Sequence, residues 1–464
     1  MSKKTKIITA CTGGCAVLFF LIYGVGIIYF SNHLFFRTIV NGINCSMLSV
    51  DETIAYLDEK VAEYTLYITG RNNFSEKIKS QDVGLQIVWD NEIKNVVERQ
   101  NSYEWPLHLF KETKYDYVYT IVLDEEMLTA KIKSWEEIKN KKQRMPKNAK
   151  IGAYSEIEKQ YILEPAEQGS YLIEKNVYQV VKEAILCLKS ELDLEEEQCY
   201  LKPRIGDEDE KLIKTLNEMN RYVSTEITYG FGENIEILNG DIIHTWISRD
   251  NYVVKIDEEA VTNYVKELSR KYDTAYRRHD FVTVNGETIT INQGHYGWWM
   301  NRTAEASELL EQIKAGNKSE RKAVYFQEAA SFDAPDYGNS YVEIDLAKQH
   351  LYLWIDGKVV LESDFVSGNL ANGNATPEGI YPITYKERNV TLRGTGYASP
   401  VSYWMPFNGG IGMHDASWRK SFGGDIYKTN GSHGCINLPL EIAQQIYEQV
   451  YTGMAVICYY SNCE

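Results

Sequence analysis

The stretch Gly431-Ser432-His433-Gly434-Cys435-Ile436-Asn437-Leu438-Pro439 places a cysteine between a glycine and an apolar residue. The run from Pro439 to Tyr451 that follows has the apolar spacing of a helix, with proline in its first turn and Gly453 as a stop. We therefore expect Cys435 to lie just ahead of a helix N-terminus. The partial positive charge at that terminus would favour a thiolate and lower the pKa of the cysteine.

A cysteine nucleophile also needs a proton acceptor and donors for an oxyanion. His414 stands 21 residues upstream and is the candidate general acid/base. The backbone N–H groups of His433 to Cys435 are candidate oxyanion donors, and Gly434 allows the chain to turn sharply there. Asp415, or its main-chain carbonyl alone, could orient the imidazole. The side chain of His433 has either a catalytic or only a loop-shaping role.

Two other interpretations apply to the same residues. His414, His433 and Cys435 could be three ligands of a zinc ion, but no fourth ligand stands at a telling spacing. A buried, inert Cys435 would leave the glycine-containing loop and the helix terminus without a purpose. We expect a cysteine nucleophile, no metal and no cofactor.

The sequence around this motif is typical of a compact, mostly β domain over residues 338–464. Residues 341–346 alternate in polarity, and Asp356-Gly357 is a strong hairpin signal because both residues tolerate positive φ. The segment starting at Pro439 is the one persuasive helix.

A histidine followed about twenty residues later by Ser-His-Gly-Cys, an apolar residue and Asn resembles the signature of the L,D-transpeptidase (YkuD-type) catalytic domain. The resemblance covers about residues 338–464 and implies a β-sandwich with a short helix. Further matching segments are Lys348 to Leu353, Thr376 to Gly379 and Tyr403 to Phe407.

This resemblance implies that Cys435 attacks the carbonyl of the third residue of a peptidoglycan tetrapeptide stem, releases D-alanine and passes the acyl group to an amine of another stem. With the side-chain amine of a third residue as acceptor, the product is a 3→3 cross-link. His414 would be the acid/base, and carbapenems would acylate Cys435 as inhibitors. The residues expected to line the substrate cleft are Tyr403, Trp418, Ser432 and Asn437.

Two alternative functions remain open at this point. An L,D-carboxypeptidase would use water as the acceptor and form the same thioester, so the sequence hardly separates it from a transpeptidase. A non-catalytic wall-binding anchor is the other alternative, and the intact pair of Cys435 and His414 speaks against it.

The middle of the chain contains a unit that occurs twice, which predicts two α+β domains over residues 46–200 and 205–330. Asp124 and Asp257 are the predicted helix N-caps of the two copies. The domains resemble peptidoglycan-binding domains of cell-wall enzymes, although rigid spacers would fit the pattern equally well. The matching segments are Val122 to Glu126 with Lys255 to Glu259, Gly169 to Ile185 with Gly297 to Ile313, and Thr65 to Gly70 with Thr225 to Gly230.

The N-terminal segment carries Lys3, Lys4 and Lys6 ahead of an uncharged run over residues 7–30. This pattern predicts a transmembrane signal-anchor helix, with a cytoplasmic tail over residues 1–6 and the catalytic domain outside, facing the wall. A cleaved signal peptide is the rival interpretation, but its apolar region should be about half as long. The net charge of −16 argues against nucleic acid as a partner.

Overall fold

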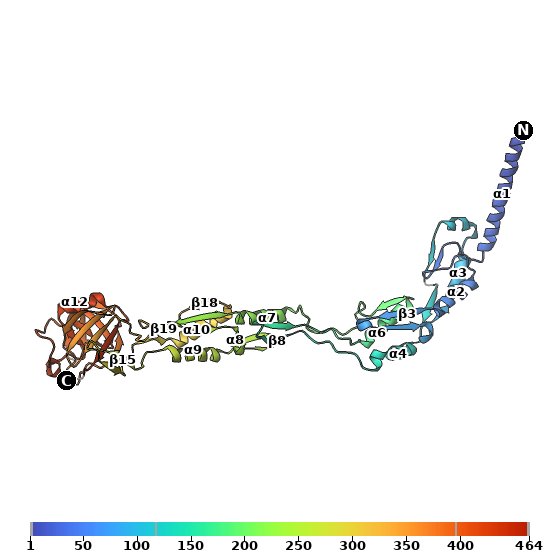
Figure 1. Cartoon of the computed structure of the whole chain (residues 1–464). Helices are drawn as coiled ribbons and strands as arrows, with labels where there is room; N and C mark the ends of the chain where they lie inside the picture. The colour runs from blue at the N-terminus through green and yellow to red at the C-terminus, as the bar shows by residue number, and fades with distance from the viewer. Residues whose placement is uncertain (1–2, 117, 395–396, 462–464) are drawn as a thin grey trace. The chain divides into compact units, whose positions relative to one another are not determined.

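The computed structural model describes residues 3–116, 118–394 and 397–461, which fall into two compact units (Figure 1). The first unit comprises Met1–Lys150 and Glu164–Asp207, and the second comprises Ile151–Leu163 and Glu208–Glu464. The stretch Ile151–Leu163 therefore packs with the second unit, although the sequence pattern placed it inside the first repeat.

The first unit begins with helix α1, and its last turns pack against a short 3-10 helix, Ser102–Leu109. The indole of Trp105 donates a hydrogen bond to the carbonyl oxygen of Tyr23 over 3.2 Å. The α-helices and strands of the unit are α1 Lys3–Phe30, β1 Thr38–Val40, β2 Ile43–Asn44, α2 Val50–Ala62, β3 Thr65–Thr69, β4 Ser75–Lys79, β5 Gln86–Trp89, α3 Glu92–Arg99, β6 Thr113–Tyr115, β7 Tyr119–Val122, α4 Glu125–Lys133, α5 Glu136–Lys139, α6 Glu174–Leu186 and β10 Glu191–Asp193.

The predicted signal anchor over residues 7–30 is wrong. Residues of this run form α1, but no helix in the described part of the chain combines the length and the apolar character needed to cross a bilayer. The prediction counted uncharged residues, and threonine, glycine and tyrosine in the run are uncharged without being strongly apolar. The predicted single-pass location, with its cytoplasmic tail and outward-facing catalytic domain, rested on that span and is corrected with it.

The second unit starts with the hairpin of β8 and β9 and continues through a set of short sheets and helices. Its elements before the last domain are β8 Lys150–Ser155, β9 Gln160–Glu164, α7 Glu210–Val223, β11 Glu226–Phe231, β12 Asn234–Leu238, α8 Gly240–Ile243, β13 Ile247–Asp250, β14 Val253–Ile256, α9 Glu258–Tyr272, β15 His279–Val282, β16 Thr288–Ile291, β17 Trp299–Met300, α10 Arg302–Ala315, β18 Lys318–Arg321 and β19 Tyr325–Gln327.

The repeated segments form matching three-stranded sheets, ordered β10-β3-β4 in the first unit and β12-β11-β18 in the second. In each sheet the central strand pairs antiparallel with the strand that follows it. It also pairs parallel with a later strand, which comes after α6 in the first sheet and after α10 in the second. Asp124 and Asp257 cap α4 and α9 by accepting hydrogen bonds from two backbone N–H groups each. Both predicted N-caps are confirmed, and the two segments share one supersecondary design.

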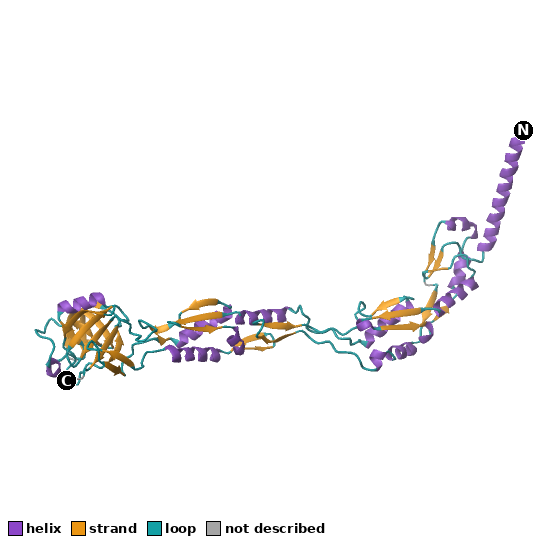
Figure 2. Cartoon of the chain, viewed as in Figure 1, coloured by secondary structure: helices purple, strands orange, loops and turns teal. Residues whose placement is uncertain are grey.

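The last domain consists mainly of strands in two sheets, with helix α12 beside them (Figure 2). The five-stranded sheet has the order β22-β21-β20-β28-β23 and the four-stranded sheet has the order β24-β25-β26-β27. The elements are β20 Tyr341–Asp345, β21 His350–Ile355, β22 Lys358–Asp364, β23 Gly379–Pro382, β24 Glu387–Gly394, β25 Tyr397–Asn408, β26 Ile411–Asp415, α11 Ile426–Asn430, β27 Ile436–Leu438, α12 Leu440–Gln449 and β28 Ala455–Tyr459.

One hydrophobic core joins these sheets and the helix. Val342 and Leu351 come from the five-stranded sheet, Met405 and Met413 from the four-stranded sheet, and Ile446 from α12, and all five side chains are fully buried. The mostly β character expected of this domain is confirmed. Because residues of β26 and β27 are part of this core, both strands are fixed supports for the residues next to them in the chain.

The hairpin of β15 and β16 packs directly on this domain. Phe281 and Tyr296 share a buried cluster with Tyr341 and Ile457 of the five-stranded sheet. The backbone N–H groups of His295 and Tyr296 both donate to the carbonyl oxygen of Ile380 over 3.0 Å. Within the second unit, the repeat module and the last domain are therefore joined by a shared core and by strand-like backbone pairing.

Candidate active site

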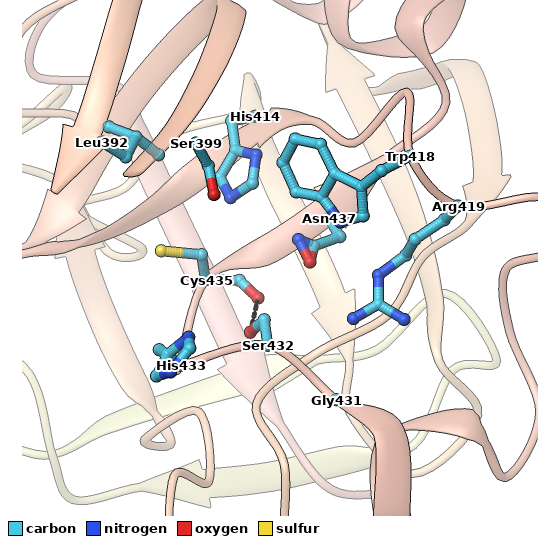
Figure 3. Close-up of a pocket in the computed structure, with 10 residues that line it drawn as sticks. All are labelled: Leu392, Ser399, His414, Trp418, Arg419, Gly431, Ser432, His433, Cys435 and Asn437. Carbon is cyan, nitrogen blue, oxygen red and sulfur yellow. Dashed lines mark hydrogen bonds between the residues drawn. The ribbon is translucent and has the colours of Figure 1, made fainter. Parts of the chain in front are cut away.

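The parallel pairing of β26 with β27 brings the two key residues of the sequence motif together. His414 lies on β26 opposite Asn437 of β27, and Cys435 immediately precedes β27. The two residues line one cavity of about 190 Å³ (Figure 3). The lining residues are Leu392, Ser399, His414, Trp418, Arg419, Gly431, Ser432, His433, Cys435 and Asn437.

His414 is almost completely buried, with 4% of its surface exposed. Its Nδ1 atom lies 2.8 Å from the main-chain carbonyl oxygen of Asp415. Because a carbonyl oxygen can only accept, Nδ1 carries the proton and the basic lone pair of the neutral ring is on Nε2. Burial lowers the pKa of His414, the bond to the Asp415 carbonyl partly opposes that shift, and the charge of Arg419 lowers the pKa further. The imidazole is thus suited to take a proton at neutral pH.

Cys435 does not lie at a helix N-terminus. Strand β27 separates it from α12, which begins only at Leu440. Burial raises the pKa of the Cys435 thiol, and a backbone hydrogen bond from Gly412 opposes the rise. The expected lowering of this pKa by a helix is therefore wrong, because the macrodipole acts only within the first turn. A raised pKa favours the thiol over the thiolate at neutral pH.

The loop before Cys435 is held by hydrogen bonds of its own. The Ser432 hydroxyl donates to the carbonyl oxygen of Cys435 over 2.6 Å and accepts from the N–H of Gly434 over 3.0 Å. Gly434 has φ of 121°, a conformation that L side chains rarely adopt. Its carbonyl oxygen accepts from the buried Thr376 hydroxyl over 2.7 Å. Ser432 lines the cavity, but its hydroxyl braces the turn.

The carbonyl and the carboxylate of Asp415 have different roles in the site. Its carboxylate Oδ1 accepts hydrogen bonds from the backbone N–H groups of Ser402 and Tyr403, over 2.7 and 2.8 Å. The carboxylate therefore holds β25 against β26, and the imidazole of His414 is oriented by the carbonyl group, the second of the two options that the sequence offered.

The structure brings most of the other predicted residues to the cavity, with one exception. Trp418 and Asn437 line it, and the Trp418 ring centroid lies 6.0 Å from that of His414. His433 is exposed and lies on the other side of Cys435 from His414 (Figure 3). Tyr403 is not brought there: its ring is buried in the core and its hydroxyl accepts from Arg388 over 3.1 Å. Strand alternation explains this, because its neighbour Trp404 takes the face toward His414.

Four lining residues were not predicted from the sequence: Leu392, Ser399, Arg419 and Gly431. Leu392 and Ser399 lie on β24 and β25 outside the segments that match the family, so only the pairing of the strands places them. Arg419 follows His414 by five residues, and a basic residue that close to a predicted base was an available signal. Within the described ranges, no group of three or more His, Cys, Asp or Glu side chains is arranged to hold a metal ion.

Comparison with protein families matches two parts of the chain. Residues 339–458 match the L,D-transpeptidase catalytic domain (YkuD), and residues 208–321 match the family described as "Putative peptidoglycan binding domain". No curated protein matches the chain.

Solved structures give the same family. The L,D-transpeptidase of Enterococcus faecium is 34% identical over 53% of this chain and 100% of its own, with a TM-score of 0.43. The catalytic domain of the E. faecium enzyme acylated by ertapenem is 42% identical over 26% of this chain and 97% of its own, with a TM-score of 0.25. An avibactam carbamoyl enzyme is 34% identical over 54% and 100%, with a TM-score of 0.43. A peptidoglycan-binding domain lies on the N-terminal side of the catalytic domain. Because the chain is 34% identical to L,D-transpeptidases that it covers over their whole length, it belongs to the L,D-transpeptidase family and is a cell-wall acyltransferase of peptidoglycan cross-linking.

Proposed function

We propose that Cys435 is the nucleophile of this transpeptidase and His414 its general acid/base. The observation that carries the assignment is that both residues line one cavity, with the imidazole fixed by the Asp415 carbonyl so that Nε2 is its basic atom. The raised pKa of Cys435 supports a step in which His414 removes the thiol proton as sulfur attacks, in place of a preformed ion pair.

In the first half-reaction, Sγ forms a bond to the carbonyl carbon of the third stem residue, and the thiol proton passes to His414. The C–N bond to the terminal D-alanine then breaks, and the imidazolium returns the proton to the leaving amine. The products are free D-alanine and a thioester on Cys435. The backbone N–H groups of the turn from His433 to Cys435 are the proposed hydrogen-bond donors to the oxyanion. The N–H of Gly434 also donates to the Ser432 hydroxyl.

In the second half-reaction, an amine of another stem attacks the thioester, His414 takes its proton, and the C–S bond breaks to restore the thiol. The side-chain amine of a third residue gives the 3→3 cross-link, whereas water as acceptor gives a trimmed tripeptide. Incubating the full chain with a disaccharide-tetrapeptide and separating the products by mass tests this proposal. Cross-linked dimer supports transfer to an amine, tripeptide alone supports the carboxypeptidase, and neither product contradicts both.

The residue assignments have their own controls. A Cys435→Ala chain should release no D-alanine, and continued release would contradict the assignment of the nucleophile. Activity should be lost on thiol alkylation and kept in the presence of a chelator, and the reverse pattern would favour a zinc site. We also propose that carbapenems acylate Cys435, supported by the ertapenem-acylated relative, and a mass increase of the intact chain that is absent from Cys435→Ala tests it.

For the modules over residues 46–200 and 205–330 we propose binding to peptidoglycan, with the catalytic domain over 338–464. The family match over 208–321 supports this for the second module. Cosedimentation of the Cys435→Ala chain with purified sacculi, in excess soluble tetrapeptide that occupies the catalytic cavity, separates binding from spacing. Retention supports binding by the modules, and no retention indicates that they only space the catalytic domain.

A further inference from the structure

Arg419 is the one cationic side chain among the described lining residues that is permanently charged. It follows β26 in a turn in which its N–H donates to the carbonyl oxygen of Ala416 over 3.0 Å. Its guanidinium group points from the Trp418 side of the cavity toward Ser432 and Gly431 (Figure 3). It therefore lies on the cavity wall that also carries the turn before the nucleophile.

The guanidinium is only partly satisfied by the protein. Nη1 donates to the main-chain carbonyl oxygen of Asn430 over 2.9 Å, whereas Nε is buried and has no hydrogen-bond partner. Burial also lowers the pKa of Arg419, which shows that the site disfavours an uncompensated positive charge. A partly buried cation with an unused donor is costly unless an acceptor arrives.

Two other half-buried arginines of this chain have carboxylate partners. Arg71 donates to Glu195 over 2.8 Å, and Arg321 donates to Glu305 over 3.0 Å. No described carboxylate forms an ion pair with Arg419, and the nearby Asp415 carboxylate is committed to backbone N–H groups of β25. Among the described residues none supplies an anion for Arg419, so an anionic group of the substrate fits beside it.

We propose that Arg419 binds the terminal carboxylate of the donor stem, and so selects a tetrapeptide that ends at the residue to be released. The inference rests on the proposed function, because it places the scissile carbonyl at Cys435. Successive α carbons are about 3.8 Å apart, so the carboxylate of the terminal D-alanine must then lie in the same cavity. A guanidinium presents two parallel N–H donors to such a group. A stem extended by one further residue has a neutral amide at this position.

The test compares two substrates on the full chain: a tetrapeptide stem with a free C-terminal carboxylate, and the same stem as a C-terminal carboxamide. The wild type should release D-alanine from the acid with a kcat/KM about 10- to 100-fold above that for release of D-alaninamide, the range expected for a charge-assisted hydrogen bond. Arg419→Gln should lose this factor on the acid and keep its rate on the amide, and Arg419→Lys should recover part of it.

The matched control is Arg388→Gln, since Arg388 stacks on Tyr403 outside the cavity and should affect both substrates equally. Equal wild-type rates on acid and amide would overturn the assignment without any variant. An Arg419→Gln loss of equal size on both substrates would also overturn it, because the residue would then only brace the turn at Asn430. Absence of release from both substrates by the wild type would instead contradict the proposed function.

Discussion

The Nδ1 atom of His414 lies 2.8 Å from the main-chain carbonyl oxygen of Asp415, while the carboxylate of Asp415 points to the backbone of β25. The histidine is thus oriented by a neutral group of its own strand. A carboxylate in that place would raise the basicity of the ring, whereas a carbonyl mainly fixes its tautomer. Burial lowers the pKa of His414 and raises the pKa of the Cys435 thiol, which favours a neutral imidazole beside a neutral thiol.

We predict that the acid limb of kcat/KM lies below the ordinary histidine pKa of about 6.5. The pKa of His414 is lowered, so the imidazole stays neutral as the pH falls until that lowered value is passed, and only then is activity lost. D-alanine release measured from acidic to neutral pH gives this midpoint.

The pKa of the Cys435 thiol gives a second test of the proposed proton transfer. Because burial raises the pKa of Cys435, its alkylation by iodoacetamide should increase with pH along a curve whose midpoint lies above the ordinary cysteine value of about 8.5. A midpoint several units lower would indicate a preformed thiolate–imidazolium pair and would contradict the proposed proton transfer.

Asp415→Ala should act on stability more than on chemistry. The change leaves the buried N–H groups of Ser402 and Tyr403 without an acceptor, which costs about 2–4 kcal/mol for two such groups. The carbonyl that orients His414 is retained. Denaturant unfolding should therefore show the loss. The acid limb of the folded variant should move to lower pH, because the Asp415 charge that raises the pKa of His414 is removed. Asp415→Asn, which keeps an acceptor oxygen, is the milder control.

Local signals in the sequence were enough for several features of the catalytic domain. Asp356 and Gly357 both have positive φ and join β21 to β22, as the hairpin signal required. The apolar face after Pro439 forms α12. These features depend on a few neighbouring residues, so a single sequence contains the information for them.

What the sequence could not supply depends on long-range pairing. Whether a helix or a strand follows Cys435 is decided by the parallel partner β26, and the three residues of β27 are too few for a periodic signal. Tyr403 and its neighbour Trp404 look equivalent in the sequence, but the face that each takes depends on the register of β25. Arg419 stands five residues after His414, but its place on the cavity wall depends on the packing around it.

Thr376→Val should loosen the turn that precedes Cys435, the proposed nucleophile. The buried hydroxyl donates to the carbonyl oxygen of Gly434 and accepts from the N–H of Gly368, so an isosteric methyl leaves both groups unpaired. We expect a loss of about 1–3 kcal/mol in the free energy of unfolding and a lower kcat for D-alanine release. Thr391→Val on the exposed face of β24 is the control, and equal effects of the two changes would contradict a role for this bridge.

Glu343→Leu should uncouple the hairpin of β15 and β16 from the catalytic domain. The Glu343 carboxylate is completely buried in β20 and accepts hydrogen bonds from the N–H of Val284, the hydroxyl of Tyr459 and the indole of Trp354, over 2.7–2.8 Å. Burial raises its pKa, and three donors compensate for the cost of burying it. Removing the acceptor leaves those donors unpaired at the junction, so hydrogen exchange of residues 279–291 should increase well before that of β25 and β26. Glu362→Leu, on an exposed position of β22, is the matched control. Unchanged exchange at the hairpin in Glu343→Leu would show that the apolar cluster alone holds the junction.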